Sequence, residues 1–140
     1  MHSFDYRHRV RYRECDPMGV VYHTHYLDYF EAARTEALRQ LGLPYAELER
    51  SGIRMPVIDL AVKYRRPAYY DDLLVIRTAL PDRAPLAKVN IDYTVLRDEE
   101  PETVLVTGHV SLCYVDATTG RPTRAPQKVL NAFAATTRVS

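Results

Sequence analysis

Residues 12–34, YRECDPMGVVYHTHYLDYFEAAR, contain the features that decide the fold of this chain. Pro17 restricts the residue before it, Asp16, to an extended conformation, and a glycine two residues later permits the backbone angles of a close turn. The two valines that follow are apolar, so we expect the loop to fold back onto the core. The stretch therefore predicts a strand end, a sharp loop and a long helix that begins near His23 or Thr24.

This arrangement is suited to acyl transfer. A helix start carries unpaired N–H groups and a partial positive charge, and Asp16 lies a few residues upstream. The N–H groups could polarise a carbonyl while the carboxylate attacks it or activates water. Most Asp-Pro dipeptides only cap a turn, so the case for chemistry depends on the neighbouring apolar loop and helix start.

A family resemblance is carried by residues spread over the whole stretch. These are Tyr12, Asp16, Gly19, Val20, Val21, Tyr22, His23, Tyr26, Tyr29, Phe30, Glu31 and Arg34. On them the chain resembles the 4-hydroxybenzoyl-CoA thioesterase family, which has the hotdog fold. A second block at residues 62–73, VKYRRPAYYDDL, is similar to the family's next signature. The run Val-Val-Tyr-His is more similar to the short-chain acyl-CoA thioesterases found beside bacterial Tol-Pal genes than to the aromatic-specific branch.

The resemblance implies an acyl-CoA thioesterase that forms a carboxylic acid and free coenzyme A without a metal or a redox cofactor. It places the catalytic carboxylate at Asp16, as nucleophile or general base, and a carbonyl-polarising backbone N–H at His23. The imidazole of His23 could also orient water or the leaving group. The substrate-binding residues expected beside them are Gly19, Val20, Tyr22, Tyr26, Lys63, Arg65 and Arg66.

The positive residues of the second block have more than one possible role. Lys63, Arg65 and Arg66 could meet the phosphates of coenzyme A, but a solvated strand edge explains them equally well. The arginines could instead receive the acidic surface of an acyl carrier protein. A non-catalytic acyl-binding protein is a third possibility, against which Asp16 argues, because a pure binder needs no carboxylate at the thioester.

Other catalytic groups find less support. Cys15 has no histidine fixed beside it, and the adjacent carboxylate would raise its thiol pKa. Glu31 and Arg34 lie one helical turn apart, as in a surface ion pair. The sequence has no Gly-x-Ser-x-Gly motif, no Cys or His pair at metal-binding spacing and no phosphate-cradling glycine loop.

The chain length of 140 residues fits a single domain over residues 1–140. A net charge of +1 gives no reason to expect a nucleic-acid partner. No apolar run has the length of a membrane span, and residues 1–10 are charged and polar rather than a signal segment. We therefore expect a cytoplasmic protein with no membrane span, in which Cys15 and Cys113 are free thiols.

Hydrophobic periodicity predicts one long helix at residues 24–42 and strands at 4–13, 57–66, 73–80, 88–97 and 103–115. Short helices are expected at residues 44–51 and 127–134. One helix covers only one face of a sheet, which indicates an α+β domain. The resemblance makes this a hotdog fold, a five-stranded antiparallel sheet wrapped around one long central helix. Pairing of sheet edges predicts a homodimer or homotetramer, and in the family the active site lies at the dimer interface.

Overall fold

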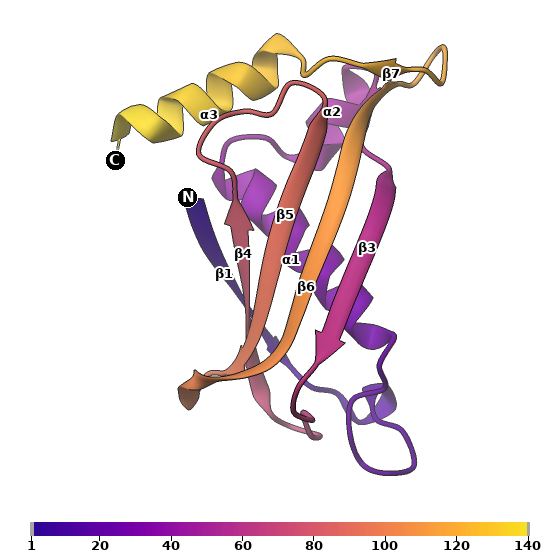
Figure 1. Cartoon of the computed structure of the whole chain (residues 1–140), viewed down its shortest axis with the longest axis vertical. Helices are drawn as coiled ribbons and strands as arrows, with labels where there is room; N and C mark the ends of the chain where they lie inside the picture. The colour runs from indigo at the N-terminus through magenta and orange to yellow at the C-terminus, as the bar shows by residue number, and fades with distance from the viewer. Residues whose placement is uncertain (1, 140) are drawn as a thin grey trace.

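The structure, a computed structural model, describes residues 2–139 and the side chains of residues 2–134. Five long strands form an antiparallel sheet in the order β1-β4-β5-β6-β3 (Figure 1). Their bounds are β1 (His2–Arg9), β3 (Val57–Tyr64), β4 (Leu73–Leu80), β5 (Lys88–Arg97) and β6 (Glu100–Asp116). Two short strands, β2 (Ile53–Arg54) and β7 (Pro122–Thr123), pair with the end of β6.

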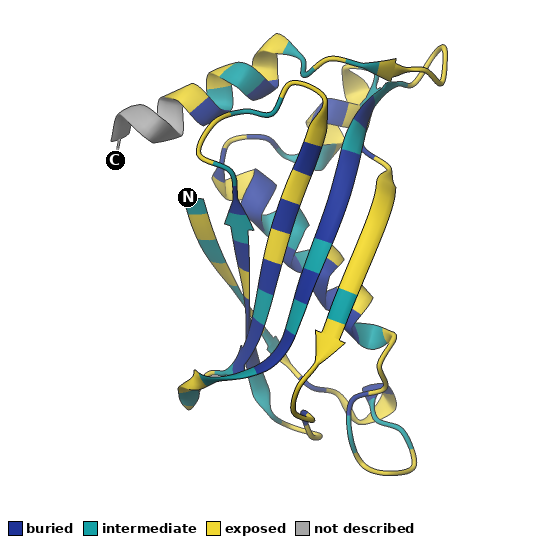
Figure 2. Ribbon diagram, in the orientation of Figure 1, coloured by how far each residue is buried: buried dark blue, intermediate teal, exposed yellow. Residues whose placement is uncertain are grey.

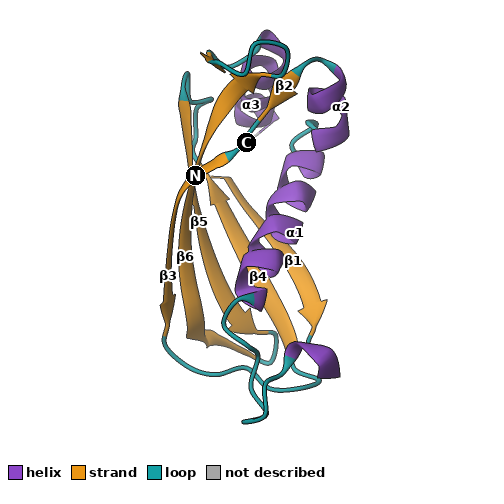
Figure 3. Ribbon diagram, turned by 90° about the vertical axis from the view of Figure 1, so that its right-hand side faces the viewer, coloured by secondary structure: helices purple, strands orange, loops and turns teal. Residues whose placement is uncertain are grey.

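The helix α1 (His25–Gln40) lies across one face of this sheet (Figure 3). Its buried side chains recur at helical spacing, as expected for a helix with one apolar face: Tyr26, Tyr29, Phe30, Ala33, Ala37 and Leu38. The other helices are the 3₁₀ turn η1 (Tyr12–Glu14), α2 (Tyr45–Arg50) and α3 (Gln127–Val139). The sheet and its central helix confirm the predicted α+β hotdog fold. No helix in residues 2–139 is both long enough and apolar enough to cross a membrane.

The middle of α1 makes the closest contact with the sheet. The Phe30 ring stacks on Tyr93 of β5, with ring centroids 4.5 Å apart and an interplanar angle of 12°. Beside it, Gly108 of β6 has no side chain, and a Cβ there would lie 2.5 Å from the Phe30 ring. The helix can therefore approach β6 this closely only because position 108 is glycine.

The first strand is shorter than its alternation predicts. β1 ends at Arg9, and Val10 then exchanges backbone hydrogen bonds with Asp71 and Asp72 before the chain turns into η1. A 3₁₀ turn ends the two-residue alternation of faces. Tyr12 is therefore 79% exposed, and Glu14 is buried.

The strands β5 and β3 differ in burial (Figure 2). β5 alternates between buried and exposed residues, as predicted. β3 is exposed along nearly its whole length, with only Val62 half-buried. The exposed side chains of β3 include large apolar ones, namely Val57, Ile58, Leu60 and Tyr64.

Candidate active site

The loop between η1 and α1 is closed by its own backbone. The N–H of Asp16 donates to the carbonyl of Val20, and the N–H of Gly19 donates to the carbonyl of Asp16, both at 2.9 Å. Cys15 and Val21 form an isolated antiparallel bridge below this turn. Gly19 has φ of 81°, a conformation that costs glycine little and other residues more. The loop is therefore a compact hairpin rather than a loose connection.

This hairpin is attached to a segment far away in the sequence. The N–H of Val21 donates to the carbonyl of Ala68 at 2.9 Å, and Val20 bridges Tyr69. The N–H of Tyr22 donates to the carbonyl of Glu14, also at 2.9 Å. The two sequence blocks that carry the family resemblance are therefore adjacent in space.

The second block is held in turn by Arg97 of β5. Its Nε donates to Asp72 Oδ2 at 2.9 Å, and its second guanidinium nitrogen donates to the carbonyl of Pro67 at 2.6 Å. Asp72 Oδ2 also accepts the N–H of Tyr69 at 2.9 Å. Burial lowers the pKa of Arg97, but its hydrogen bond and ion pair with Asp72 outweigh this and raise it overall. Local sequence gives no sign of this support, because Arg97 lies at the end of an alternating strand and its partners lie about 25 to 30 residues away.

The carboxylate of Asp16 caps its own turn. Oδ1 accepts the N–H of Met18 at 2.8 Å and lies 3.5 Å from the N–H of Val20. Within the described part of the chain, Oδ2 accepts no hydrogen bond. One oxygen of Asp16 is thus held in place by the loop, while the other is available to a ligand or a water molecule.

The start of α1 has unpaired donors. Thr24 occupies the N-cap position, but its side chain makes no capping bond. The N–H of His25 donates to the carbonyl of Tyr22 at 3.0 Å, whereas the N–H groups of His23 and Thr24 donate to no acceptor in residues 2–139. Such groups attract negative charge at a helix start.

A pocket of about 370 Å³ joins these groups. Its lining residues are Asp16, Val20, Val21, Tyr22, His23, Tyr26, Tyr64, Arg65, Arg66 and Pro67. Of the residues that the sequence assigned to the site, only Gly19 and Lys63 are not part of this lining. Gly19 shapes the hairpin turn, and Lys63 is an exposed residue of β3.

Aromatic rings form much of the pocket wall. Tyr64 packs edge-on against Tyr26 at 5.6 Å and against His23 at 6.2 Å between ring centroids. The Tyr64 hydroxyl donates to the His23 carbonyl at 2.9 Å, which fixes the peptide at the helix start. Burial raises the pKa of Tyr26 to about 12 and also raises the pKa of Tyr64, so both hydroxyls are neutral near pH 7. Tyr64 was missed as a site residue, although it lies within the second signature block.

A second hollow of about 750 Å³ continues from the pocket. Arg65, Arg66 and Pro67 line both, and Glu102, Thr103 and Val104 complete the second. The backbone N–H groups of both arginines donate to the carbonyl of Leu105, at 2.8 and 3.0 Å. Among the described side chains, no acidic group pairs with either guanidinium. The two charges are therefore available to a ligand.

Three other candidates lie outside this chemistry. Burial, followed by the charges of Glu14 and Asp16, raises the pKa of the Cys15 thiol, which confirms the expected direction. Glu31 lines hollows beside α1 that do not include Asp16. The expected ion pair between Glu31 and Arg34 is not formed, because Arg34 donates to the buried Tyr93 hydroxyl at 3.0 Å instead. Within the described residues, no cluster of three or more His, Cys, Asp or Glu side chains could hold a metal ion, and both cysteines are free.

Comparison with known proteins gives consistent matches. The chain matches the thioesterase-like superfamily over residues 10–133. It is 33% identical over 132 residues to the acyl-CoA thioesterase YbgC of Haemophilus influenzae, a match that covers 94% of each chain. YneP of Bacillus subtilis is 38% identical over 82 residues, which is 59% of the length of each chain.

The solved structures agree with these matches. The crystal structure of the DHNA-CoA thioesterase from Staphylococcus aureus has a TM-score of 0.87 and 27% identity. The superposition covers 99% of this chain and 93% of that one. By its sequence and its hotdog fold, this chain belongs to the thioesterase-like superfamily.

Proposed function

We infer that the protein is an acyl-CoA thioester hydrolase, which converts a thioester and water into a carboxylic acid and free coenzyme A. Membership of the superfamily and the near-full-length similarity to an acyl-CoA thioesterase support this function. The observation that carries the mechanism is the pocket where Asp16 lies with the unpaired N–H groups at the start of α1.

Asp16 either activates the attacking water or attacks the thioester itself. With Oδ1 held by the Met18 N–H, Oδ2 takes a proton from water as the water oxygen bonds to the thioester carbon. Alternatively, Oδ2 attacks the carbon itself, and water then hydrolyses the resulting anhydride. In both routes the C–S bond breaks and the thiolate leaves to be protonated. The two routes share the same requirement for an ionised carboxylate beside the carbonyl.

The start of α1 stabilises the oxyanion. Negative charge develops on the carbonyl oxygen as the attacking bond forms, and preorganised backbone N–H groups stabilise it. His23 supplies such a group, and the hydrogen bond from Tyr64 to its carbonyl holds the peptide in place. We assign the main role of His23 to this N–H and a lesser role, in ordering water, to its imidazole.

The arginine-lined hollow receives the coenzyme. Arg65 and Arg66 lie at the boundary between the pocket and the second hollow, and their charges are free to meet phosphate groups. Lys63 lies outside both hollows and serves at most as a more distant positive charge. The same two arginines also fit the acidic surface of an acyl carrier protein. A higher kcat/KM for the carrier-loaded acyl group than for the matching coenzyme A ester would favour the carrier.

We also propose that the protein is at least a homodimer. β3 pairs only with β6 among the described strands, and it exposes large apolar side chains. An exposed apolar edge strand is a template for pairing with another chain. Tyr64, at the end of β3, lines the pocket, so pairing at this edge would bring the second copy close to the site.

The test is a hydrolysis assay with acyl-CoA esters of graded length and aromaticity. Asp16→Asn should lower kcat on the order of a thousandfold, because the amide can neither attack nor take a proton. Asp116→Asn is the matched control, because Asp116 Oδ1 caps a turn in the same manner, at 2.8 Å from the N–H of Thr118, outside the pocket. Near-normal turnover in Asp16→Asn would refute the mechanism, and no turnover of any thioester by the wild type would refute the function.

A further inference from the structure

Glu14 is a buried carboxylate for which the proposed reaction has no use. It is the one charged side chain buried among the described residues, and its residue exposure is 9%. Burying an ionised carboxylate is costly unless hydrogen bonds compensate for the lost water. A buried charge two residues before the proposed catalytic carboxylate therefore requires an explanation.

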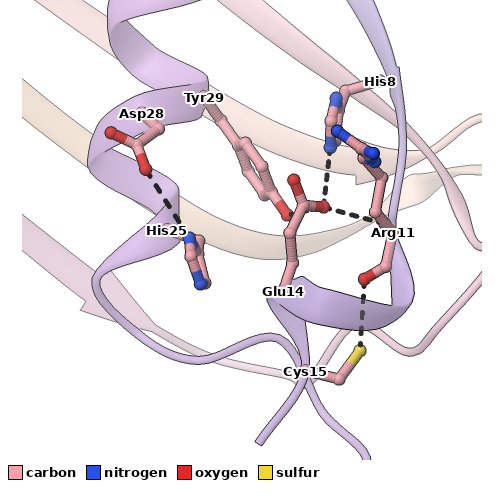
Figure 4. Close-up of polar contacts among 7 residues, drawn as sticks. All are labelled: His8, Arg11, Glu14, Cys15, His25, Asp28 and Tyr29. Atoms are coloured by element: carbon pink, nitrogen blue, oxygen red, sulfur yellow. Dashed lines mark hydrogen bonds and ion pairs between the residues drawn. The ribbon is translucent and has the colours of Figure 1, made fainter.

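Three donors from different parts of the fold meet at one oxygen of this carboxylate (Figure 4). Glu14 Oε1 lies 2.9 Å from His8 Nε2 on β1, 2.8 Å from the Arg11 N–H and 2.9 Å from the Tyr29 hydroxyl on α1. The side chain thus connects the first strand, the 3₁₀ turn and the helix. Burial raises the pKa of Glu14, but the bonds from Arg11, His8 and Tyr29 outweigh it and hold the pKa below its ordinary value of 4.5.

The backbone of Glu14 connects this junction of β1, η1 and α1 to the loop that carries Asp16. Its carbonyl accepts the N–H of Tyr22 at 2.9 Å, at the far end of the hairpin that presents Asp16. On the helix side, the Tyr29 ring packs edge-on against Tyr26, a pocket residue, with ring centroids 5.5 Å apart. Glu14 therefore holds both ends of the site, the loop by its backbone and the helix by its side chain.

We propose that Glu14 is a positioning residue, which fixes the loop of residues 15–22 against α1 so that Asp16 and the helix-start N–H groups meet the same thioester carbonyl. This inference rests on the proposed thioester hydrolysis. Displacing a reacting group by about 1 Å can cost on the order of a hundredfold in rate. A residue that only stabilised the fold would not change the rate of molecules that remain folded.

The first test measures kcat and KM for Glu14→Gln, which keeps the shape but removes the charge. We expect kcat to fall between about tenfold and a hundredfold, with KM changed by less than about threefold. The matched control is Asp92→Asn, which removes a carboxylate from another histidine pair, Asp92 with His109 at 2.7 Å on the exposed face of the sheet. That control should retain wild-type kcat. A kcat within about twofold of wild type in folded Glu14→Gln would overturn the proposal.

The second test asks whether Tyr29 acts through Glu14. Tyr29→Phe removes one donor to Glu14 with little change in packing and should lower kcat by about threefold to tenfold. In the Glu14→Gln background the same change should have almost no further effect, because the two residues act as one unit. Independent losses that multiply in the double variant would contradict the proposed role. If Glu14→Gln does not fold, kcat of Tyr29→Phe tests the proposal by itself, and wild-type kcat in that variant would overturn it.

The third test is independent of turnover. Amide hydrogen exchange at Tyr22, whose N–H donates to the Glu14 carbonyl, should be faster by about tenfold or more in Glu14→Gln. Exchange at Ile91, in the core of β5, should not change. If the wild type hydrolyses no thioester, the proposed function fails, but the exchange data still show whether Glu14 holds the loop. Unchanged exchange at Tyr22 would overturn the proposal that Glu14 holds the loop.

Discussion

The start and the middle of helix α1 differ in how completely their groups are satisfied. At the start, the N–H groups of His23 and Thr24 have no acceptor in the described chain, and both residues are exposed. In the middle, Phe30 is buried between Tyr93 and the bare backbone of Gly108. One helix therefore supplies unpaired donors at one end and close packing about two turns later.

This difference indicates that the start of α1 serves catalysis, whereas its middle serves the stability of the fold. Unpaired donors at an exposed helix start can be occupied by a developing oxyanion at little cost to the fold. Close packing in the middle has no spare volume, so even one added methyl group must displace a neighbour. We therefore expect substitutions at the start to change rate and substitutions in the middle to change the free energy of unfolding.

Within helix α1 and the segments packed against it, the largest effect is expected from removing the His23 N–H itself. His23→Pro has no backbone donor, so kcat should fall on the order of a hundredfold to a thousandfold. His23→Ala retains the N–H and should lose only about tenfold, from disturbed water and packing. The measurement is kcat for both variants, with melting temperatures to show that each is folded. If the alanine variant loses as much as the proline variant and its pH–rate profile changes, the imidazole has a larger role than we assign to it.

The second prediction concerns the middle of the helix. Gly108→Ala should lower the free energy of unfolding by about 1–3 kcal/mol, because the new Cβ would lie 2.5 Å from the Phe30 ring. The activity per folded molecule should change little. Denaturant unfolding measures the loss, and the same substitution in a Phe30→Leu background should cost less, because the smaller side chain leaves room. Equal losses in both backgrounds would show that Phe30 is not the source of the strain.

The third prediction concerns whether the activity at the helix start depends on pairing with a second copy of the chain. Leu60→Lys places a charge on the exposed edge strand β3, and it should weaken dimerisation by about tenfold or more. Ser3→Lys places the same charge on the opposite edge strand β1 as a control. Sedimentation and kcat would be measured across protein concentrations, with activity expected to fall as the dimer dissociates. A fully active monomer would separate the site from assembly.

The smallest effect is expected from titrating Glu14, which ties the loop to α1. Its pKa in the folded protein lies below the ordinary value of 4.5, so its stabilising contribution is present above that value. The contribution is lost as the pH falls through the folded-state pKa. The difference in unfolding free energy between wild type and Glu14→Gln should therefore be constant near pH 7 and shrink in acid. A difference that grows in acid would contradict this sign.

Local patterns predicted much of the fold. β4 and β5 occupy the residues that alternation and turn signals predicted, 73–80 and 88–97. α1 was predicted from apolar spacing, and Gly42, just beyond its end, has φ of 92°. For the site, the sequence predicted Asp16 and the helix start at His23 as catalytic groups. Those catalytic roles stay predictions until turnover is measured.

Local patterns could not predict the contacts between segments that are far apart in the sequence. In the sequence, Glu14 is only a residue just after a predicted strand. Nothing in the neighbouring residues indicates that His8 and Tyr29 form hydrogen bonds with its carboxylate. Tyr64 and Arg97 belong to the site only because residues 64–72 pack beside the hairpin loop. Each of these interactions depends on how the elements pack together, and local periodicity does not predict the order of the strands in the sheet.

The sequence by itself determined the long helix, most of the long strands and the residue types available for acyl transfer, and its resemblance to known proteins indicated the family. The helices, strands and residue types follow from periodicity, turn chemistry and composition, which act between neighbours in the chain. Only the tertiary structure decided which carboxylate is buried, which N–H groups remain unpaired and which edge strand is uncovered. Burial and pairing are settled when segments far apart in sequence pack together, because a polar group is satisfied or left free by whatever reaches it in space.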